Sequence, residues 1–367
     1  MKIAIATDAW ESQTNGVVTT LKATIETLIE LGHEIRVISP QGRFSIPAPS
    51  YPEIRLALAP GRHIAREIAG FRPHAIHIAT EGPVGLAMRR YCRRHRLPFT
   101  TSYHTRYPEY LNARWPIPIS VSYAWLRRFH NAAARTFVAS ESLRVQLSAK
   151  GFARLHLWRR GVNLERFRPL ASSLPQELMG LRRPLMAYMG RLAVEKNIEA
   201  FLRLQVPGTK LLIGNGPQRA ELIARYPDAV LTGYRFGDEL AALLSSADVF
   251  VFPSRTDTFG LAMIEALACG TPVAAFPVPG PLDVLEHGVT GVMSENLAQA
   301  IEGALQLDRQ VCAERARAFT WIAATRQFFE GLEPIPAAAR AALPGRGSAM
   351  IAPNAARSQP SSAGDAN

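Results

Sequence analysis

Two carboxylates, Asp257 and Glu265, lie eight residues apart in a segment that changes character several times. An apolar strand pattern over 249–252 gives way to a polar loop that carries Asp257, and a helical pattern that contains Glu265 begins after Gly260. Both side chains therefore follow the carboxyl end of a predicted strand, where open α/β sheets bind ligands. The alternative is structural, with Asp257 as a cap and Glu265 as a solvated surface carboxylate.

Two cations, Arg191 and Lys196, lie five residues apart in a second predicted strand-to-helix loop, which begins at Gly190. A guanidinium fork and an ammonium at this spacing can clamp a diphosphate, although ordinary surface cations would also fit. Gly214 and Gly216 form a further turn after the next strand, where the missing side chains allow close backbone approach.

Polar loops also follow strands in the first half of the chain. The buried-strand pattern over 2–7 leads through a loop to Gly16 and a helix, an arrangement that can hold phosphate or sugar at a helix amino end. The residues around Gly16 have neither the glycine spacing of dinucleotide-binding sites nor the lysine of a P-loop. A later strand ends in Tyr103 and His104.

The elements that must position these residues alternate between strand and helix along both halves. We predict an α/β protein of two doubly wound domains, residues 1–170 and 171–318, with 53–60 among the strands of the first. A helix over 319–333 is expected to pack back on the first domain. The Ala-, Pro-, Ser- and Gly-rich residues 334–367 are predicted to be disordered.

Composition narrows the class of protein further. No apolar run approaches the length of a membrane span, and the first residues are typical of a strand and not of a signal peptide, which predicts a cytoplasmic protein. The three cysteines are far apart and are expected to be buried thiols. Neither the cysteines nor the histidines have metal-ligand spacing, so no metal site is expected.

The positive charge is confined to the first half of the chain. Residues 1–170 hold 25 Lys and Arg against 11 Asp and Glu, whereas 171–367 hold 17 against 19. Such a basic half suits nucleic acid or an anionic membrane, and arginine-rich composition alone is an equal alternative. The aromatic and Arg-rich residues 106–135 favour the membrane, and nucleic acid is disfavoured because no recognition motif is present.

Four segments of the second half, GRLAVEKN, IGNGP, SRTDTFGLAMIEALACGTPV and GVTGV, resemble in order and spacing the nucleotide-sugar half of retaining glycosyltransferases of family 4. In the first half, TDAWESQTNGVV, SYHTRYPEY and RRGVNLERFRP resemble the acceptor half of that family. The resemblance covers residues 1–332 and implies the GT-B fold, in which two Rossmann-like domains face each other across a cleft.

The resemblance also implies roles for individual residues. Arg191 and Lys196 would bind the donor diphosphate, Glu265 the ribose hydroxyls, and Asp257, where the family usually has Glu, the donor sugar. His104 would lie by the acceptor or the donor sugar and complete the catalytic set. The remaining positions would bind the donor at Gly16, Gly190, Gly214, Gly216, Phe259, Gly260 and Leu261, and the acceptor at Asn15, Tyr103 and Tyr107.

The family resemblance finally implies an activity. We expect transfer of a hexose from a UDP- or GDP-sugar to a membrane lipid such as diacylglycerol, with an α-glycosidic product, no metal and no other cofactor. The alternative acceptor is a soluble molecule or a polysaccharide, as for a GDP-mannose-dependent α-mannosyltransferase. The basic first domain would rest on the inner face of the cell membrane. Arg160 and Gly161 fall in the family's R-G-V-D signature, with Asn163 replacing the Asp.

Overall fold

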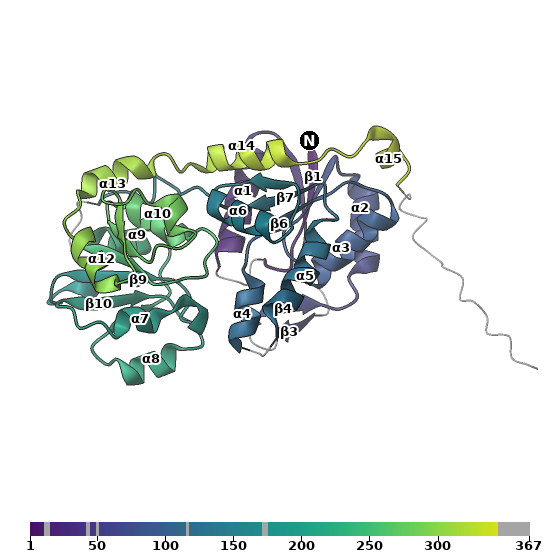
Figure 1. Ribbon diagram of the computed structural model, residues 1–367. Coiled ribbons are helices and arrows are strands. Elements are labelled where there is room, and N and C mark those ends of the chain that lie inside the picture. Colours follow the sequence, from purple (N-terminus) through teal and green to yellow (C-terminus); the bar gives the residue numbers. More distant parts are fainter. Residues whose placement is uncertain (11–14, 42–44, 49–50, 115–116, 171–174, 344–367) are drawn as a thin grey trace, which may run out of the picture.

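The computed structural model describes residues 1–10, 15–41, 45–48, 51–114, 117–170 and 175–343. The chain forms two α/β domains side by side, and near its end it returns from the second domain to the first, where a helix lies across the first domain (Figure 1). Each domain is built on a six-stranded sheet. The predicted fold of two doubly wound domains is confirmed.

The first sheet has the order β2-β1-β5-β6-β7-β8, and all of its strand pairs are parallel. Its strands are β1 (Lys2–Ala6), β2 (Glu34–Ile38), β5 (Ala75–Ile78), β6 (Thr100–Tyr103), β7 (Arg135–Val138) and β8 (Leu155–Leu157). Its helices are α1 (Gly16–Glu30), α2 (Gly61–Phe71), α3 (Pro83–Arg94), α4 (Tyr107–Arg114), α5 (Ile119–His130) and α6 (Glu141–Ala149).

The second sheet has the order β11-β10-β9-β12-β13-β14 and is also parallel. Its strands are β9 (Leu185–Met189), β10 (Thr209–Ile213), β11 (Val230–Gly233), β12 (Val249–Phe252), β13 (Val273–Ala275) and β14 (Gly291–Met293). Its helices are α7 (Ile198–Leu202), α8 (Arg219–Arg225), α9 (Gly237–Ser246), α10 (Leu261–Ala268), α11 (Pro281–Val284), α12 (Leu297–Ala304) and α13 (Arg309–Ala316). Counted within the domain, this is the Rossmann order 3-2-1-4-5-6.

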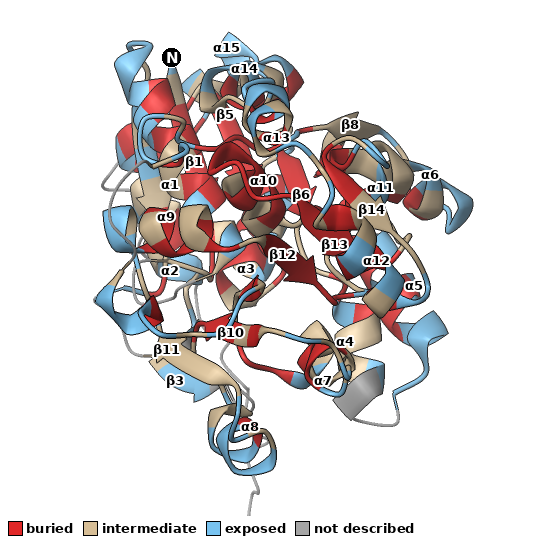
Figure 2. Cartoon of the chain, turned by 90° about the vertical axis from the view of Figure 1, so that its left-hand side faces the viewer, coloured by how far each residue is buried: buried red, intermediate tan, exposed pale blue. Residues whose placement is uncertain are grey.

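Central strands are apolar throughout because helices cover both faces of each sheet. Residues Ile3–Ala6 of β1 and Val249–Val251 of β12 are fully buried, and the helices expose only their outer faces (Figure 2). Parallel strands with both faces covered lose the polar alternation of half-exposed strands. The three cysteines, Cys92, Cys269 and Cys312, are free and buried in these cores, as expected.

The strand predicted over 53–60 is present as β4 (Tyr51–Ala57), but it lies outside the main sheet. It pairs antiparallel with β3 (Ser45–Ala48) in a separate two-stranded sheet. Pro47 and Pro52 lie in these two strands. Proline cannot donate to a ladder hydrogen bond, so proline-containing strands suit an edge or an isolated hairpin better than a central position.

The two connections between the domains lie against each other. The Val162 amide donates to the carbonyl of Phe319 at 3.0 Å, and a β-carbon on Gly161 would lie 2.4 Å from the Trp321 nitrogen. Only glycine allows this approach of two backbones. A linker is predicted from the sequence around 169–175, and residues 171–174 of it lie outside the described part of the chain.

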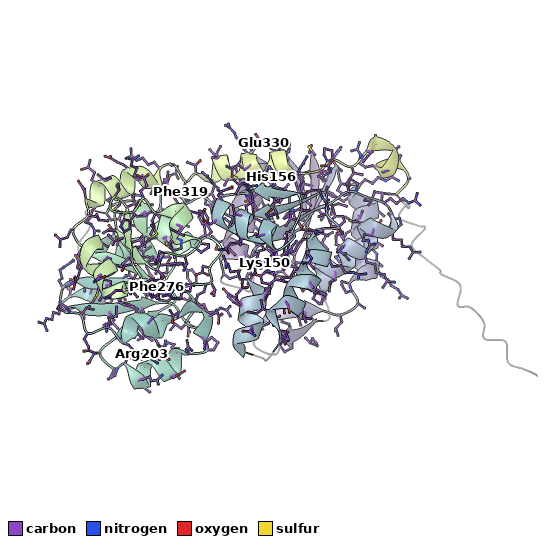
Figure 3. The ribbon with its side chains drawn as sticks, viewed as in Figure 1. Lys150, His156, Arg203, Phe276, Phe319 and Glu330 are labelled. Atoms are coloured by element: carbon purple, nitrogen blue, oxygen red, sulfur yellow. The ribbon has the colours of Figure 1, made fainter. Side chains whose placement is uncertain are left out.

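Helix α14 (Trp321–Gly331) lies on the first domain. Its Phe328 is fully buried beside Trp158, with ring centroids 4.7 Å apart, and Phe329 stacks on His33 at 4.6 Å. Figure 3 shows Glu330 on α14 above His156, whose Nε2 lies 3.0 Å from the carbonyl oxygen of Gln327. Helix α14 therefore belongs to the core of the first domain, although it follows the second domain in sequence.

The predicted disorder of the tail is wrong for its first ten residues. The Ile335 amide donates to the His74 carbonyl at 2.7 Å, and Ile335 and Leu343 are buried in the first-domain core on either side of α15 (Ala337–Ala341). Two apolar anchors on a short segment give no helical or strand periodicity, so composition alone misjudged it. Residues 344–367 lie outside the described part of the chain.

Candidate active site

The predicted donor residues meet where the strand order of the second sheet reverses. Strands β9 and β12 are neighbours there, and the loops beyond their carboxyl ends run side by side. The Lys196 ammonium forms an ion pair with Oδ1 of Asp257, and the Thr256 hydroxyl donates to the Glu195 carbonyl at 3.1 Å. The structure thus joins two loops that are about 60 residues apart in sequence, at the position where doubly wound sheets bind ligands.

Lys196 keeps its positive charge in this half-buried position. Burial disfavours the ammonium, but the attraction of Asp257 and of the neighbouring phenols outweighs burial, so the pKa of Lys196 lies above its ordinary value. Arg191 lies on the same loop, half-buried, and its carbonyl accepts from the Tyr188 hydroxyl at 2.9 Å. The loop therefore presents two fixed cations near the carboxyl end of β9.

The glycines of this region are explained by contact between two loops. A β-carbon on Gly214 would lie 1.9 Å from the Gly190 carbonyl oxygen, and one on Gly216 would lie 2.4 Å from the Leu192 carbonyl oxygen. The Leu192 amide donates to the Asn215 carbonyl at 2.9 Å. The loops after β9 and β10 are therefore held together backbone to backbone, which fixes the position of the cation-bearing loop.

Helix α10 presents its amino end to the first domain. Its N-cap, Gly260, has a φ of +91° and provides no side-chain cap, while Phe259 just before it is buried. A β-carbon on Gly16, at the start of α1, would lie 3.3 Å from Cδ1 of Leu261. Two helix amino ends, each with a positive partial charge, therefore approach one another across the domain boundary, an arrangement suited to an anion.

Glu265 lies one turn inside α10 and is partly exposed. Burial of its carboxyl raises its pKa to about 8. Within the described part of the chain, no hydrogen bond or salt bridge engages this side chain. A carboxyl in this state is available to accept hydroxyl donors from a ligand.

His104 follows β6 and lies at the boundary between the domains. Its carbonyl accepts from the Thr258 hydroxyl of the second domain at 2.9 Å, and its Nδ1 lies 3.2 Å from Nη2 of Arg160. Burial lowers the pKa of His104 well below the usual value, and the charge of Arg160 adds to this effect. The imidazole is therefore neutral at physiological pH and can act through a hydrogen bond but not as a cation.

The three residues predicted to bind the acceptor substrate lie in different surroundings. Tyr103 is wrong as a side-chain contact, because it is fully buried against Phe152, with ring centroids 5.8 Å apart. The strand pattern could not tell that β6 would be buried up to and including its last residue, Tyr103. Asn15 caps α1, its Oδ1 accepting from the Val17 and Val18 amides at 3.0 Å. Tyr107, the first residue of α4, is 39% exposed.

Sequence reasoning missed Tyr110 and Thr258. Tyr110, on α4 of the first domain, lies close enough to Lys196 and Asp257 for both charges to act on it; burial raises its pKa and Lys196 opposes that rise. Thr258 provides the hydrogen bond to His104 described above. No spacing rule relates residues about 150 positions apart, so the only available signal was the aromatic content of the segment around Tyr110.

The described residues contain neither a metal-binding cluster nor a membrane-spanning helix. No group of three His, Cys, Asp or Glu side chains in that part of the chain is arranged to hold a metal ion. No described helix is both long and apolar enough to cross a bilayer.

Comparisons with known proteins agree with this geometry. Residues 14–166 match the model of Glycosyltransferase Family 4, and residues 183–307 match that of Glycosyl transferases group 1. The chain is 31% identical over 318 residues to a GDP-mannose-dependent alpha-mannosyltransferase of Mycobacterium tuberculosis, covering 80% of this chain and 83% of that protein. It is 32% identical over 299 residues to the sulfoquinovosyl transferase SQD2 of Arabidopsis thaliana, covering 73% and 58%.

A solved structure shares the fold. Sucrose-phosphate synthase from Thermosynechococcus elongatus superposes with a TM-score of 0.71 at 23% identity, over 90% of this chain and 97% of that one. With the two family matches and the mannosyltransferase similarity across most of both chains, the protein belongs to glycosyltransferase family 4 and has the GT-B fold.

Proposed function

We propose that this glycosyltransferase moves a hexose from a nucleotide sugar to a membrane lipid and forms an α-glycosidic bond with retention of configuration. The observation that carries the proposal is the Lys196–Asp257 pair at the strand-order reversal, beside the amino end of α10. An alternative acceptor is a soluble molecule or a polysaccharide, since the pair concerns the donor alone.

The charged and hydrogen-bonding groups of the site match different parts of a nucleotide sugar. Lys196, Arg191 and the amino end of α10 suit the diphosphate, whose charge grows as the bond to the sugar breaks. Glu265, with its unengaged carboxyl, suits the ribose hydroxyls. Asp257 suits the hydroxyls of the donor sugar, next to the cation that holds the leaving group.

GDP-mannose is the first donor to test. Proteins described as GDP-mannose-dependent alpha-mannosyltransferases from Mycobacterium tuberculosis and Corynebacterium glutamicum are 31% and 28% identical to this chain over at least 80% of its length. A sulfoquinovosyl donor is the second choice, because of the similarity to SQD2.

The surroundings of the site favour direct transfer on one face of the sugar. Asp8 and Glu81, at the carboxyl edge of the first sheet, are both engaged: Asp8 accepts from the Val84 amide at 2.8 Å, and Glu81 is paired with His130 at 3.0 Å. Neither is left as a nucleophile. We infer that the bond from the anomeric carbon to phosphate oxygen breaks as the bond to the acceptor oxygen forms, while the departing phosphate oxygen takes the acceptor proton.

Helices α3 and α5 form the surface that would meet the membrane. Arg89 on α3 donates to the carbonyls of Phe129 and Arg128 at 3.1 and 2.8 Å and so ties the two helices together. Trp125 and Val121 of α5 are 47% and 59% exposed. The exposed arginines of the same two helices and the turn after α3 are Arg90, Arg93, Arg94, Arg96, Arg127 and Arg128.

Exposed aromatic and aliphatic side chains beside several arginines suit an anionic lipid surface. Helix α4, which carries Tyr110, packs on α5, so this surface adjoins the site. The C-terminal domain has no comparable excess of positive charge. A membrane contact through the first domain would leave the donor half facing the aqueous side.

A donor panel tests the proposed activity. The protein is incubated with GDP-mannose, other GDP-sugars and UDP-sugars together with a membrane lipid extract, and the linkage of the product is determined by NMR. We expect one donor to give an α-linked glycolipid. A β-linked product, or a glycosyl adduct trapped on a protein side chain, would contradict the mechanism, and transfer only to water-soluble acceptors would favour the alternative.

Vesicle flotation tests the membrane contact separately. Binding to vesicles that contain anionic lipid should fall as salt is raised, and Trp125→Ser should weaken it. The control is Met179→Ser, since Met179 is 62% exposed in the second domain, away from the basic surface. Binding that is indifferent to salt and to anionic lipid would remove the membrane part of the proposal while leaving the transferase activity intact.

A further inference from the structure

Arg160 is a buried arginine with an unusual set of partners. Its side chain is 5% exposed, its guanidinium lies 4.5 Å from the ring centroid of Trp158, and Nη1 donates to the Trp158 and Arg159 carbonyls. Its remaining recorded partner is Nδ1 of His104, 3.2 Å from Nη2. The guanidinium is thus fixed on one side by its own strand end and faces the His104 ring on the other.

The contact with Arg160 decides where the His104 proton lies. A guanidinium has five N–H donors and no acceptor, so Nδ1 of His104 must accept and therefore carries no proton. In a neutral imidazole the proton then lies on Nε2. This Nε2 atom is buried and has no hydrogen-bond partner in the described part of the chain.

A buried N–H group without a hydrogen-bond acceptor is unfavourable, because it has lost its hydrogen bonds to water. A ligand that accepts from this group would compensate for that loss. The backbone of the same residue is bonded to Thr258, one position after Asp257 in the donor loop. The unsatisfied Nε2–H thus belongs to the residue that joins the first domain to the donor loop.

We propose that Arg160 is a positioning residue which fixes the His104 ring in its Nε2–H tautomer, so that His104 donates one hydrogen bond to a hydroxyl oxygen of the bound sugar. This inference rests on the proposed function, because it assumes that the donor sugar lies beside Asp257 and His104. It assigns a purpose to the Arg of the R-G-V segment, which the sequence by itself left without one.

The electrostatic surroundings agree with a permanently neutral ring. Besides burial and Arg160, the ionisable side chains that act on His104 are His77 on β5 and His130 on α5, and each would lower the pKa of His104 when it carries a proton. His77 is itself neutral, since burial lowers its pKa to about 3. The carboxylate of Glu81 lies on the far side of His130, to which it is hydrogen-bonded at 3.0 Å. Protonation of His104 is thus opposed mainly by burial and by the charge of Arg160.

Nitrogen-15 NMR of the histidine rings tests the tautomer in the ligand-free protein. The His104 signals are assigned as those lost in His104→Gln. We expect a protonated Nε2 and an unprotonated Nδ1 that stay unchanged between about pH 5.5 and pH 8, across the ordinary titration range of histidine. A proton on Nδ1, or a titration within that range, would overturn the proposal without any variant of Arg160.

Substitutions of Arg160 then test its positioning role. Arg160→Met removes every donor to Nδ1 and should give a mixture of tautomers, while kcat falls about 10- to 100-fold, as for other outer partners that orient a histidine. Arg160→Gln keeps a neutral N–H donor and should retain the Nε2–H signal and recover part of the lost rate. The control is Arg159→Met, at the exposed neighbouring position.

Two results would reject this role: an unchanged tautomer in Arg160→Met, or a kcat equal to that of the control. If Arg160→Met does not fold, the wild-type spectrum and Arg160→Gln still decide the question. The NMR measurement needs no substrate, so a failure of every sugar donor would reject the proposed function and leave the tautomer result standing.

Discussion

The two sheets offer the same kind of crevice, and the protein uses the two crevices differently. At the reversal of strand order in the first sheet, between β1 and β5, Asp8 accepts from the Thr80 hydroxyl and from the amides of Val84 and Gly85 in the first turn of α3. At the equivalent place in the second sheet, Asp257 forms an ion pair with Lys196 from the neighbouring loop and does not cap α10.

The difference shows how one architecture can serve two purposes. In the first domain the carboxylate satisfies a helix amino end, a structural task that leaves it no free role. In the second domain, α10 receives no side-chain cap, and Glu265 within it stays unengaged in the described part of the chain. The groups left unsatisfied by the fold are the ones that a nucleotide sugar would satisfy, so four variants should separate structural from functional polar groups.

The largest effect is expected for Lys196→Ala. Removal of the cation beside the departing diphosphate should lower kcat/KM by about 100- to 1000-fold, the range seen when a preorganised charge-stabilising group is lost. The measurement is the rate of nucleoside diphosphate release with the donor found in the panel. Lys2→Ala is the control, because Lys2 lies in the first domain, where its ammonium contacts Glu34 at 3.4 Å and the Phe71 ring at 5.3 Å. A variant that kept a tenth of the activity would contradict the role.

Asp8→Ala should instead reduce stability. Loss of the acceptor strands the amides of Val84 and Gly85 and the Thr80 hydroxyl, which should lower the free energy of unfolding by about 2 to 3 kcal/mol. Urea unfolding measures this change, and the donor KM of the folded variant should stay within about threefold of the wild type, since the donor half is untouched. A large rise in donor KM at unchanged stability would contradict this expectation and would indicate that both crevices contribute to donor binding.

Gly214→Ala tests the contact that holds the cation-bearing loop. Gly214 has a φ of +150°, and an added β-carbon would meet the Gly190 carbonyl at 1.9 Å, so the loop must move at a cost of about 1 to 3 kcal/mol and the donor KM should rise. Gly32→Ala is a matched control, because Gly32 has a φ of +81° and no atom lies within 4 Å of its would-be β-carbon. Equal donor KM values for the two variants would show that the close contact of Gly214 with Gly190 does not position the cation-bearing loop.

Glu265→Gln gives the smallest and most diagnostic change. The folded pKa of Glu265, about 8, exceeds the unfolded value near 4.5, so the folded state binds more protons and wild-type stability falls as pH rises between these values. The glutamine variant lacks this loss. The free energy of unfolding of the variant, relative to wild type, should therefore rise by about 1 kcal/mol from pH 5 to pH 8 and stay constant above pH 8. Solvent access to the carboxyl limits the size of this change. Thermal unfolding at several pH values checks this, and a constant difference would refute the raised pKa.

Some expectations from sequence depend on information that is local in the chain. Continuous apolar runs bounded by glycine and proline predicted both sheets, and cations or carboxylates just after such runs were placed at sheet edges before any contact was known. Arg191, Lys196 and Asp257 follow the ends of β9 and β12 by two to seven residues, and Glu265 lies thirteen residues after β12, within α10. The structure adds that the two loops carrying them touch.

Other features depend on contacts between distant residues. Tyr103 and His104 are consecutive, yet one ring lies in the core and the other at the domain boundary, because Tyr103 is the last residue of the fully buried strand β6 and His104 is the first residue beyond it. Residues 334–343 have no periodic pattern, and only their fit against the first domain orders them. The hairpin of β3 and β4 likewise depends on which partner a strand finds.

The sequence by itself therefore determined the class of fold, the two domains and the loops that carry the donor-binding candidates, because periodicity and strand-end chemistry are properties of short segments. Only the tertiary structure decided that Tyr110 reaches Lys196 from the other domain and that Arg160 sets the proton position on His104. These relations depend on where two separately folded domains and two distant strand ends come to lie, and no local pattern records that.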